Sequence, residues 1–483
     1  MVGLLQVLSR KQAMKRTYLL FILLLAIFTE FNATSGSKPQ TVIIKDVPHV
    51  MQRPDFCGEA CVAMALGKLK HAGTQDWVFN HSGLKPLQGR GCYTPDLATA
   101  LKAIGFKPGP VGFTVSATNA DKELRALWQK TVDDLRRNIP SIVCMRSNDR
   151  PHASEHMRLV VGYDPDKKEV IYHEPAEKDG AYQHMDLTTF LDLWPINKST
   201  ANWTVIRFRM EAGKLKEYVA PTGFTDADYT QHYMELKKRV PSGFTVTLEK
   251  PFFVIGNDTP QVIETRWAKG TVHWAVSKFK ELYFTKDPNN ILDVWLFKDD
   301  ASYRKYNKEL WGTEPSTPFG YYSQVKRALV MNIATGGGTL VHEIVHPFME
   351  ANFPACPDWL NEGMGSLYEQ SAYRDDKIVG LTNWRLAGLQ DAIRNKTLPS
   401  FKRMITVDDF YRQPTGYGQA RYLCYYLQNK DLLIKFYQEF RANADKDPSG
   451  YNTLKKVLGV NDMDTFQKKW ESWVLKLKFP PST

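Results

Sequence analysis

Residues 342–346 read His-Glu-Ile-Val-His, and this spacing constrains the fold because residues i and i+4 of a helix share one face. Two imidazoles on one face can reach the same metal ion, while Glu343 beside them can hold a water molecule against it. Upstream, the apolar run and the glycines of residues 327–339 predict a strand and a turn that lead into a buried helix. The motif therefore predicts a metal site on a helix in the second half of the chain.

A second helix would bring a third ligand to this site. Pro354 and Pro357 end the first helix, and Asp358 is a suitable N-cap for a helix that carries Glu362 in its first turn. Two antiparallel helices joined by a short turn would place Glu362 against the histidine pair. Three protein ligands with one open position are typical of catalytic zinc, whereas structural zinc has four.

Residues 244–475 resemble the gluzincin metallopeptidases through the motifs HEIVH, WLNEG and GYGQARYLCYYL. The resemblance implies zinc-dependent hydrolysis of peptide bonds with Glu343 as the general base. It implies that Zn²⁺ is bound by three side chains, His342, His346 and Glu362. It also implies a residue that stabilises the oxyanion, for which we expect Tyr417, because this residue opens a helix soon after the zinc helices.

Two neighbouring residues affect the geometry of this predicted site. Pro347 follows the second histidine and removes a helical hydrogen bond to the carbonyl of Glu343, so we expect a kink there. Glu369 lies seven residues after Glu362 and shares its helix face. It either supports a metal ligand through a hydrogen bond or is a solvated or paired carboxylate.

A second constellation lies near the N-terminus. Gln52 precedes by five residues Cys57, which begins an apolar helix. A cysteine at a helix N-terminus feels the positive end of the helix dipole, so we expect a lowered thiol pKa, and the side chain of Gln52 can donate to an oxyanion. His156 begins an apolar strand and Glu174 ends the next, where its carboxylate can accept from an imidazole nitrogen. The order Gln, Cys, His, carboxylate is the papain-like layout.

Residues 42–195 resemble the papain-like cysteine peptidases of the double-glycine leader-peptidase type and their transporter-free relatives. The resemblance is carried by Gln52, Cys57-Gly58, His156 with VVGYD, and Glu174-Pro175. It implies that Cys57 is the nucleophile, His156 the base, Glu174 the orienting acid and Gln52 the oxyanion donor. Two residues depart from the family pattern, because Glu59 stands where proline is usual and Glu174 where aspartate is common.

An alternative interpretation makes this first domain a binding module. Cys61 lies one helical turn after Cys57, and either residue could be tied into a disulfide, for example with Cys92. If Cys57 were oxidised in this way, the nucleophile would be lost. The alternatives at the level of the whole protein are a metallopeptidase with an inactive peptide-binding first domain, or a non-catalytic surface protein that uses zinc for structure.

The order of predicted elements indicates a multidomain α+β protein. Helices at 57–70 and 93–105 precede strands at 141–145, 157–164 and 169–175, which is a helical half followed by an antiparallel sheet. Further on, residues 244–256, 291–297 and 327–333 predict strands, residues 260–284 predict a helix, and residues 298–326 predict a loop. We predict the following division: signal peptide 1–36, papain-like domain 41–207, linker 208–243 with a short helix near 226–239, strand-rich part of a zincin-like domain 244–338, and its mostly helical zinc-binding part 339–483.

The N-terminus predicts export. Met14-Lys15-Arg16 precede an apolar run at 18–28, and Ala33-Thr34-Ser35 offer a cleavage site, which together are typical of a secretory signal peptide, with a signal anchor as the alternative. No later stretch is apolar enough to predict a membrane span. The formal net charge is +11, but lysine and arginine are scattered among acids, so we predict no nucleic-acid partner. We expect an exported peptidase with a peptide or protein substrate.

Overall fold

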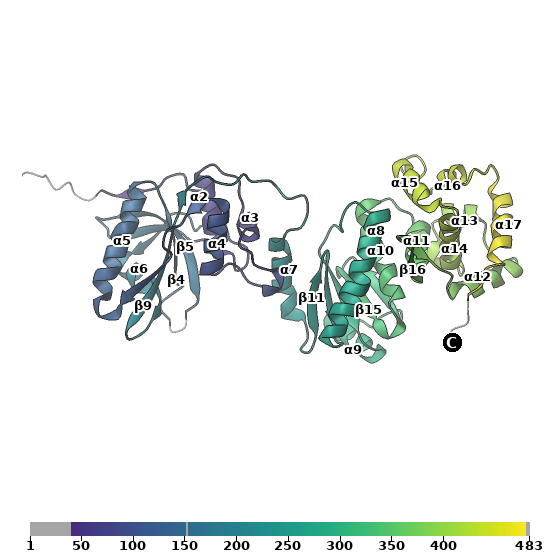
Figure 1. The fold of residues 1–483 in the computed structure, drawn as a ribbon, viewed down its shortest axis with the longest axis horizontal. Helices are drawn as coiled ribbons and strands as arrows, with labels where there is room; N and C mark the ends of the chain where they lie inside the picture. Colours follow the sequence, from purple (N-terminus) through teal and green to yellow (C-terminus); the bar gives the residue numbers. More distant parts are fainter. Residues whose placement is uncertain (1–39, 151–152, 480–483) are drawn as a thin grey trace, which may run out of the picture. The chain divides into compact units, whose positions relative to one another are not determined.

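The computed structural model describes residues 40–150 and 153–479. This described chain folds into two compact units, one made of residues up to Gly83 with Gly91–Tyr218, and one made of Leu84–Arg90 with the residues from Val219 onward (Figure 1). The predicted signal peptide lies outside the described residues, and the other predicted boundaries stay predictions. Across residues 40–150 and 153–479, no helix is both long and apolar enough to cross a membrane.

The first unit is an α+β fold built on an antiparallel sheet, as the sequence predicts. Its helices are α2 (Cys57–Lys68), α3 (Gln75–Asn80), α4 (Thr94–Ile104), α5 (Ala120–Arg136) and α6 (Leu187–Leu193), with a 3₁₀ turn η2 (Ala117–Asn119). Its strands are β1 (Val42–Ile43), β2 (Phe106–Lys107), β3 (Gly112–Ser116), β4 (Ser141–Arg146), β5 (Glu155–Asp164), β6 (Glu169–His173), β7 (Gln183–Asp186), β8 (Pro195–Lys198), β9 (Asn202–Arg209) and β10 (Glu211–Ala212). The sheet has the order β3-β9-β4-β5-β6-β7, with β1 beside β5 and β8 beside β9, and β10 pairs separately with β2.

The hairpin of β5 and β6 holds two of the predicted catalytic residues. The carboxylate of Asp164 accepts hydrogen bonds from the backbone N–H groups of Asp166 and Lys167 at 3.1 and 3.2 Å, which closes the turn between the strands. Helix α2 packs on β5 and is buried on nearly all sides from Gly58 to Leu66, which explains its almost uniformly apolar sequence. The start of α2 is thereby fixed against this hairpin.

The second unit combines a mixed sheet with many helices. Its helices are α7 (Asp226–Arg239), α8 (Trp274–Leu282), α9 (Asp300–Trp311), α10 (Gly338–Asn352), α11 (Asp358–Tyr368), α12 (Arg385–Arg394), α13 (Phe401–Thr406), α14 (Gly416–Asn429), α15 (Leu433–Asn443), α16 (Tyr451–Leu458) and α17 (Met463–Val474). A π-helical segment η3 (Val262–His273) leads into α8, and there are short 3₁₀ turns η1 (Pro86–Gln88), η4 (Ile333–Thr335) and η5 (Phe410–Arg412). Its strands are β11 (Thr245–Glu249), β12 (Phe252–Gly256), β13 (Leu292–Phe297), β14 (Gly320–Ser323), β15 (Ala328–Asn332), β16 (Ser371–Arg374) and β17 (Lys377–Gly380).

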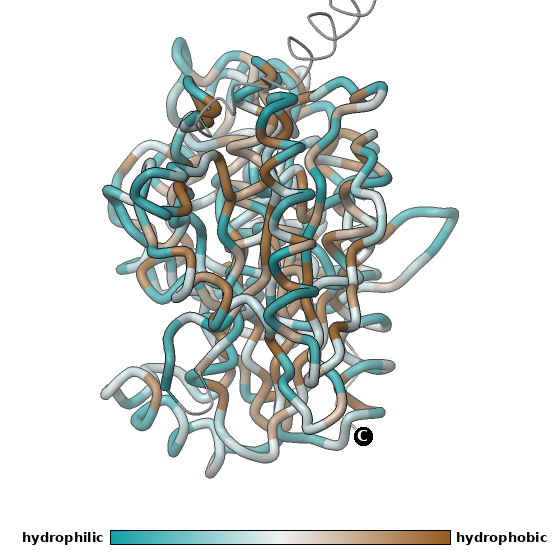
Figure 2. Tube along the Cα trace, turned by 90° about the vertical axis from the view of Figure 1, so that its left-hand side faces the viewer, coloured by the Kyte–Doolittle hydropathy of each residue, from teal (hydrophilic) through white to brown (hydrophobic). Residues whose placement is uncertain are grey.

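The sheet of the second unit has the order β11-β12-β13-β15-β14, in which the three inner strands are parallel and the two edge strands antiparallel to their neighbours. The inner strands are buried throughout. Helices η3, α8, α10 and α11 contribute to the core on one face, whereas α7 and α9 pack on the other. In Figure 2, where the first unit faces the viewer, apolar stretches run along inner segments of the trace and hydrophilic ones along many loops at its edge. Helix α10 is thus held in the core beside the sheet.

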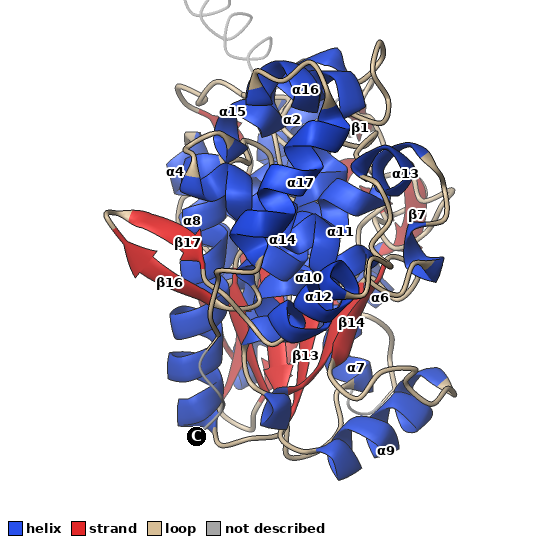
Figure 3. Ribbon diagram, turned by 90° about the vertical axis from the view of Figure 1, so that its right-hand side faces the viewer, coloured by secondary structure: helices blue, strands red, loops and turns tan. Residues whose placement is uncertain are grey.

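Three parts of the second unit differ from the sequence prediction. Residues 244–256, predicted as one strand, form the hairpin of β11 and β12 with its turn at Lys250–Pro251. Residues 298–326, predicted as a loop, contain α9 and β14. The mostly helical region after residue 339 includes the hairpin of β16 and β17, which projects from the helices in Figure 3. Its loop residues Asp375 and Asp376 have φ values of 49° and 59°, as a type I′ turn requires.

Candidate active sites

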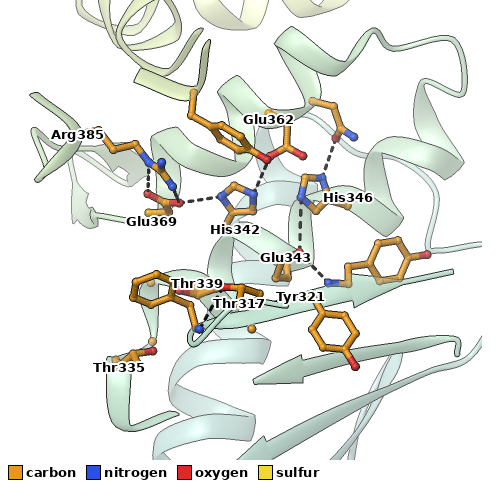
Figure 4. Close-up of a pocket in the computed structure, with 18 of the residues that line it drawn as sticks. Thr317, Tyr321, Thr335, Thr339, His342, Glu343, His346, Glu362, Glu369 and Arg385 are labelled. Carbon is orange, nitrogen blue, oxygen red and sulfur yellow. Dashed lines mark hydrogen bonds and ion pairs between the residues drawn. The ribbon is translucent and has the colours of Figure 1, made fainter. Parts of the chain in front are cut away.

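The histidine pair of the HEIVH motif lies on α10, which continues through Pro347 as a helix. Both side chains are buried, with 5% of His342 and 7% of His346 exposed. Nδ1 of His342 lies 3.1 Å from Oε1 of Glu369, and Nδ1 of His346 lies 3.0 Å from Oδ1 of Asn361. Because a carboxylate and an amide oxygen can only accept, each Nδ1 donates. Both Nε2 atoms remain for the site (Figure 4).

Helix α11 brings Glu362 against the first histidine. Its Oε2 lies 3.1 Å from Nε2 of His342, and its Oε1 accepts a 3.1 Å hydrogen bond from the hydroxyl of Tyr411. Asp358 is the first residue of α11 and Pro357 its N-cap, one position earlier than predicted. Burial opposes ionisation of Glu362, but its hydrogen bond with His342 and the charges of both histidines lower the pKa of the carboxyl.

Glu343 faces the same histidines from α10. Its Oε2 accepts a 3.0 Å hydrogen bond from the backbone N–H of Tyr322 on β14 and lies 3.7 Å from Nε2 of His346. Ligand atoms of His342, Glu343 and His346 all lie within 4.8 Å of one another. Glu362 is not part of that tightest group and reaches it through its contact with His342. Two imidazoles and two carboxylates therefore converge at this point (Figure 4).

Glu369 lies behind His342 and contacts it at Nδ1, and it is also a paired carboxylate, so both of the contacts considered for it are present. The guanidinium of Arg385 donates to both of its oxygens at 2.7 and 3.0 Å, and the amide of Asn383 donates to Oε2 at 3.1 Å. Burial opposes ionisation, but the hydrogen bonds from His342 and Arg385 lower the pKa of Glu369 to about 2. Although burial lowers the pKa of His342, its hydrogen bonds to Glu362 and Glu369 raise that pKa to about 10.

These groups line a cavity of about 940 Å³, which is also lined by residues of β14, by the glycines at 336–338 and by Tyr411 and Tyr417. Tyr417, the predicted oxyanion donor, is the second residue of α14, and its ring centroid lies 5.1 Å from Cζ of Arg385. Burial and the nearby charge of Glu362 raise its pKa. Tyr411 lines the cavity too and was missed, because no helix or motif marks η5 in the sequence.

All four residues of the cysteine constellation lie in the first unit, where hydrogen bonds link His156 to Glu174 and Gln52 to the next residue, Pro175. His156 on β5 donates from Nε2 to Oε1 of Glu174, which directly follows β6. The backbone N–H of Gln52 donates to the carbonyl of Pro175 at 2.9 Å, so Gln52 lies beside the acid. Oε1 of Gln52 has no hydrogen-bond partner within the described residues. Arg158, which the sequence analysis missed, donates from Nε to Oε2 of Glu174 at 2.6 Å.

Cys57 begins α2 and is half-buried. Burial raises the pKa of its thiol to about 11, and the backbone N–H of Met157 only partly opposes this. The prediction of a lowered pKa is therefore wrong for the isolated thiol, because desolvation outweighs the helix terminus. Gly58 allows the close approach of helix and strand, since a Cβ there would lie 2.6 Å from Sδ of Met157, the neighbour of His156.

The alternative in which Cys57 or Cys61 forms a disulfide is not what the structure shows. All six cysteines lie in the described residues and are free thiols. The backbone N–H of Cys92 donates instead to the carboxylate of Glu59 at 2.8 Å. Glu59, the departure from the family pattern, is fully buried, and burial raises its pKa to about 7.

Comparison with known proteins adds a relationship for the first unit. No curated protein matches the chain. Among solved structures, the peptidase domain of Streptococcus ComA, a bi-functional ABC transporter involved in a quorum-sensing pathway, is 17% identical over 34% of this chain and 99% of that one, with a TM-score of 0.24. A family model described as Peptidase_C39 like family matches residues 44–202, about a third of the chain. The first unit therefore contains a C39-peptidase-like domain at residues 44–202, for which peptides or proteins are the expected substrates.

Proposed function

We propose that the chain is an exported peptidase with two hydrolytic sites, a zinc site on α10 and α11 and a cysteine site at the start of α2. One observation carries the zinc proposal. Both imidazoles donate from Nδ1 to oxygen acceptors, so the Nε2 atom of each ring is left to bind a metal ion at the same buried position. Zinc ligands in proteins are commonly oriented in this way. The donor set of His342, His346 and Glu362 fits Zn²⁺, which favours imidazole nitrogen and carboxylate oxygen.

The residues around this point suit peptide hydrolysis. Bound zinc would supply Lewis acidity, which polarises a carbonyl and makes water more acidic. Glu343 would accept a proton and deliver it to the leaving amine, and the N–H of Tyr322 orients its carboxylate for that task. Tyr417 supplies a protonated hydroxyl that would donate to the developing oxyanion. These are the roles that the resemblance to gluzincins in HEIVH and WLNEG implies.

The cysteine site would act by acyl transfer. His156 takes the proton of Cys57, and the sulfur attacks the peptide carbonyl carbon while Gln52 donates to the oxyanion. The C–N bond breaks, the amine leaves with the proton from His156, and water then hydrolyses the thioester. Glu174 holds Nε2 of His156 throughout, which leaves the other ring nitrogen for the proton transfer.

The raised thiol pKa of Cys57 favours a second candidate function, in which the first unit binds peptides without cleaving them. Burial raises the thiol pKa of Cys57 to about 11, so only pairing with His156 could generate thiolate at neutral pH. If that pairing does not occur, the first unit would be a binding module that captures peptide for the zinc site.

The deciding experiment measures metal content and hydrolysis of a mixed peptide library by the mature full chain. We expect about one zinc per chain by analogy with mononuclear peptidases. Glu343→Gln should abolish chelator-sensitive cleavage while retaining zinc, and Cys57→Ala should abolish only chelator-resistant cleavage. Absence of zinc would contradict the first site. Unchanged cleavage in Cys57→Ala would support the binding-module alternative.

A further inference from the structure

The carboxylate of Glu174, the acid of the proposed cysteine site, has three hydrogen-bond donors. Oε1 of Glu174 accepts from His156 and from the backbone N–H of Ala176, the latter at 3.1 Å. Oε2 accepts from Nε of Arg158 at 2.6 Å. Only 7% of Glu174 and 8% of Arg158 is exposed, so this is a buried ion pair in which the charges are weakly screened.

Arg158 is itself fixed in place. It lies on β5 two residues after His156, so both side chains emerge on the same face of the sheet. Its Nη2 donates to the carbonyl of Ser147 at 3.4 Å, and its guanidinium lies 5.7 Å from the ring centroid of Tyr172 on β6. The arginine is thus held from three sides and cannot leave Glu174 without losing buried contacts.

We propose that Arg158 is a positioning residue of the cysteine site, which holds Glu174 towards His156 and offsets the charge of that carboxylate. This inference rests on the proposed role of Cys57 as a nucleophile. A free carboxylate would stabilise the imidazolium strongly, whereas a carboxylate paired with a guanidinium orients the ring with little net charge. Arg158 would therefore move the working pH range of the cysteine–histidine pair downward. Burial opposes ionisation of Glu174, but the hydrogen bond and charge of His156 and the charge of Arg158 lower its pKa to about 2, so this acid stays ionised.

Other charged and titratable groups surround this pair. They are Asp55, Cys57, Glu59 and Cys61 around the start of α2, Cys144 and Glu155 on β4 and β5, Tyr172 and His173 on β6, and His49, whose Nε2 contacts the carbonyl oxygen of Glu174. None of these groups is a permanent cation, so Arg158 supplies the fixed positive charge among them. Removal of that charge should raise the pKa of the Cys57 thiol.

The test is the pH dependence of alkylation at Cys57 by iodoacetamide, in which an S–C bond forms and iodide leaves. Site-resolved mass spectrometry of the full chain separates Cys57 from Cys61, and Cys57→Ala confirms the assignment. Arg158→Gln should shift the alkylation profile to higher pH by about one unit. Arg158→Lys, which keeps the charge but not the fork geometry, should keep the profile in place and lower the rate several-fold. The matched control Arg125→Gln removes an exposed arginine on α5 and should leave the profile unchanged.

Each outcome decides the matter. The inference is supported if the alkylation profile of Arg158→Gln moves to higher pH and that of Arg158→Lys stays at the wild-type pH. If Arg158→Gln instead lowers reactivity at every pH without moving the profile, Arg158 has a merely structural role and the inference is overturned. If Arg158→Gln does not fold, Arg158→Lys carries the test, and wild-type rates in that variant overturn the orienting role. If Cys57 reacts no faster than an unactivated thiol at any pH in the wild type, the proposed cysteine chemistry fails and the inference fails with it.

Discussion

Both units contain a histidine whose carboxylate partner is itself held by an arginine. The three residues are His156, Glu174 and Arg158 in the first unit, and His342, Glu369 and Arg385 in the second. In the first unit the three residues come from two adjacent strands. In the second they come from α10, from the residue after α11 and from the start of α12. The same arrangement of charges is thus built from unrelated local structures.

The difference between the sites lies at the other nitrogen of each ring. Nε2 of His156 contacts its carboxylate, which leaves Nδ1 for the proposed proton transfer. His342 has Nδ1 on its carboxylate, and its Nε2 faces Glu362 and the second histidine. An anchored carboxylate orients a ring equally well in both cases. The groups that face the free nitrogen therefore determine whether a histidine suits base catalysis or metal binding.

The largest predicted effect on activity is the loss of the two proposed oxyanion donors, one in each site. Gln52→Ala should lower Cys57-dependent cleavage, and Tyr417→Phe zinc-dependent cleavage, each by about 10²–10³-fold in kcat. Tyr411→Phe is the matched control, since the hydroxyl of Tyr411 already donates to Glu362 and should matter less. Rates on the peptide library with and without chelator separate the two sites. Equal losses in Tyr411→Phe and Tyr417→Phe would contradict the role given to Tyr417.

Two buried groups of the first unit, Glu59 and His173, have pKa shifts that give a pH prediction for that unit. The raised pKa of Glu59, about 7, stabilises the fold below its unfolded value near 4.5, and that stability is lost as pH rises through 7. Burial lowers the pKa of His173 to about 4, so its contribution is present above 6.5 and lost as pH falls through 4. Each term is about 3 kcal/mol. The two oppose each other between pH 4.5 and 6.5.

We therefore expect the stability of the first unit to change little over that range in the wild type. In Glu59→Gln it should rise with pH, and in His173→Phe it should fall. The stability of the first unit at each pH can be measured by hydrogen exchange of the α2 amides in the full chain at increasing urea concentrations. Parallel curves for the wild type and both variants would show that neither group titrates on unfolding.

The sequence predicted those features of the fold that depend on residues close together in the chain. The i, i+4 histidines, the helix after Pro357 and the β5–β6 hairpin depend on neighbouring residues, and the antiparallel α+β first unit is confirmed. The zinc ligands stay a prediction. The i, i+2 spacing places Arg158 on the same face as His156, but its contact with Glu174, like that of Tyr322 with Glu343, joins different elements and is not revealed by spacing. Helix α9 could have been found, because Asp299 and Ser302 form a capping box at its start.

The glycines next to the two sites test how rigidly each is packed. A Cβ at Gly338, where α10 begins, would lie 2.2 Å from the backbone carbonyl oxygen of Glu369. A Cβ at Gly58 would meet Sδ of Met157 at 2.6 Å, and that side chain can rotate. Gly338→Ala should therefore cost about 2–3 kcal/mol of stability and Gly58→Ala clearly less. Thermal unfolding of both variants measures this, and a larger loss in Gly58→Ala would reverse the ranking.

The smallest effect concerns the two acceptors that hold the zinc-site histidines. Glu369 is ionised and anchored by Arg385, whereas Asn361 offers a neutral amide oxygen to His346. A hydrogen bond to an ionised acceptor is stronger, so Glu369→Ala should weaken zinc affinity by about 10–100-fold and Asn361→Ala by less. Competition with a chromogenic chelator measures both affinities. If Asn361→Ala costs as much as Glu369→Ala, the anchored charge adds nothing to orientation, and the parallel with Glu174 and Arg158 does not extend to the zinc site.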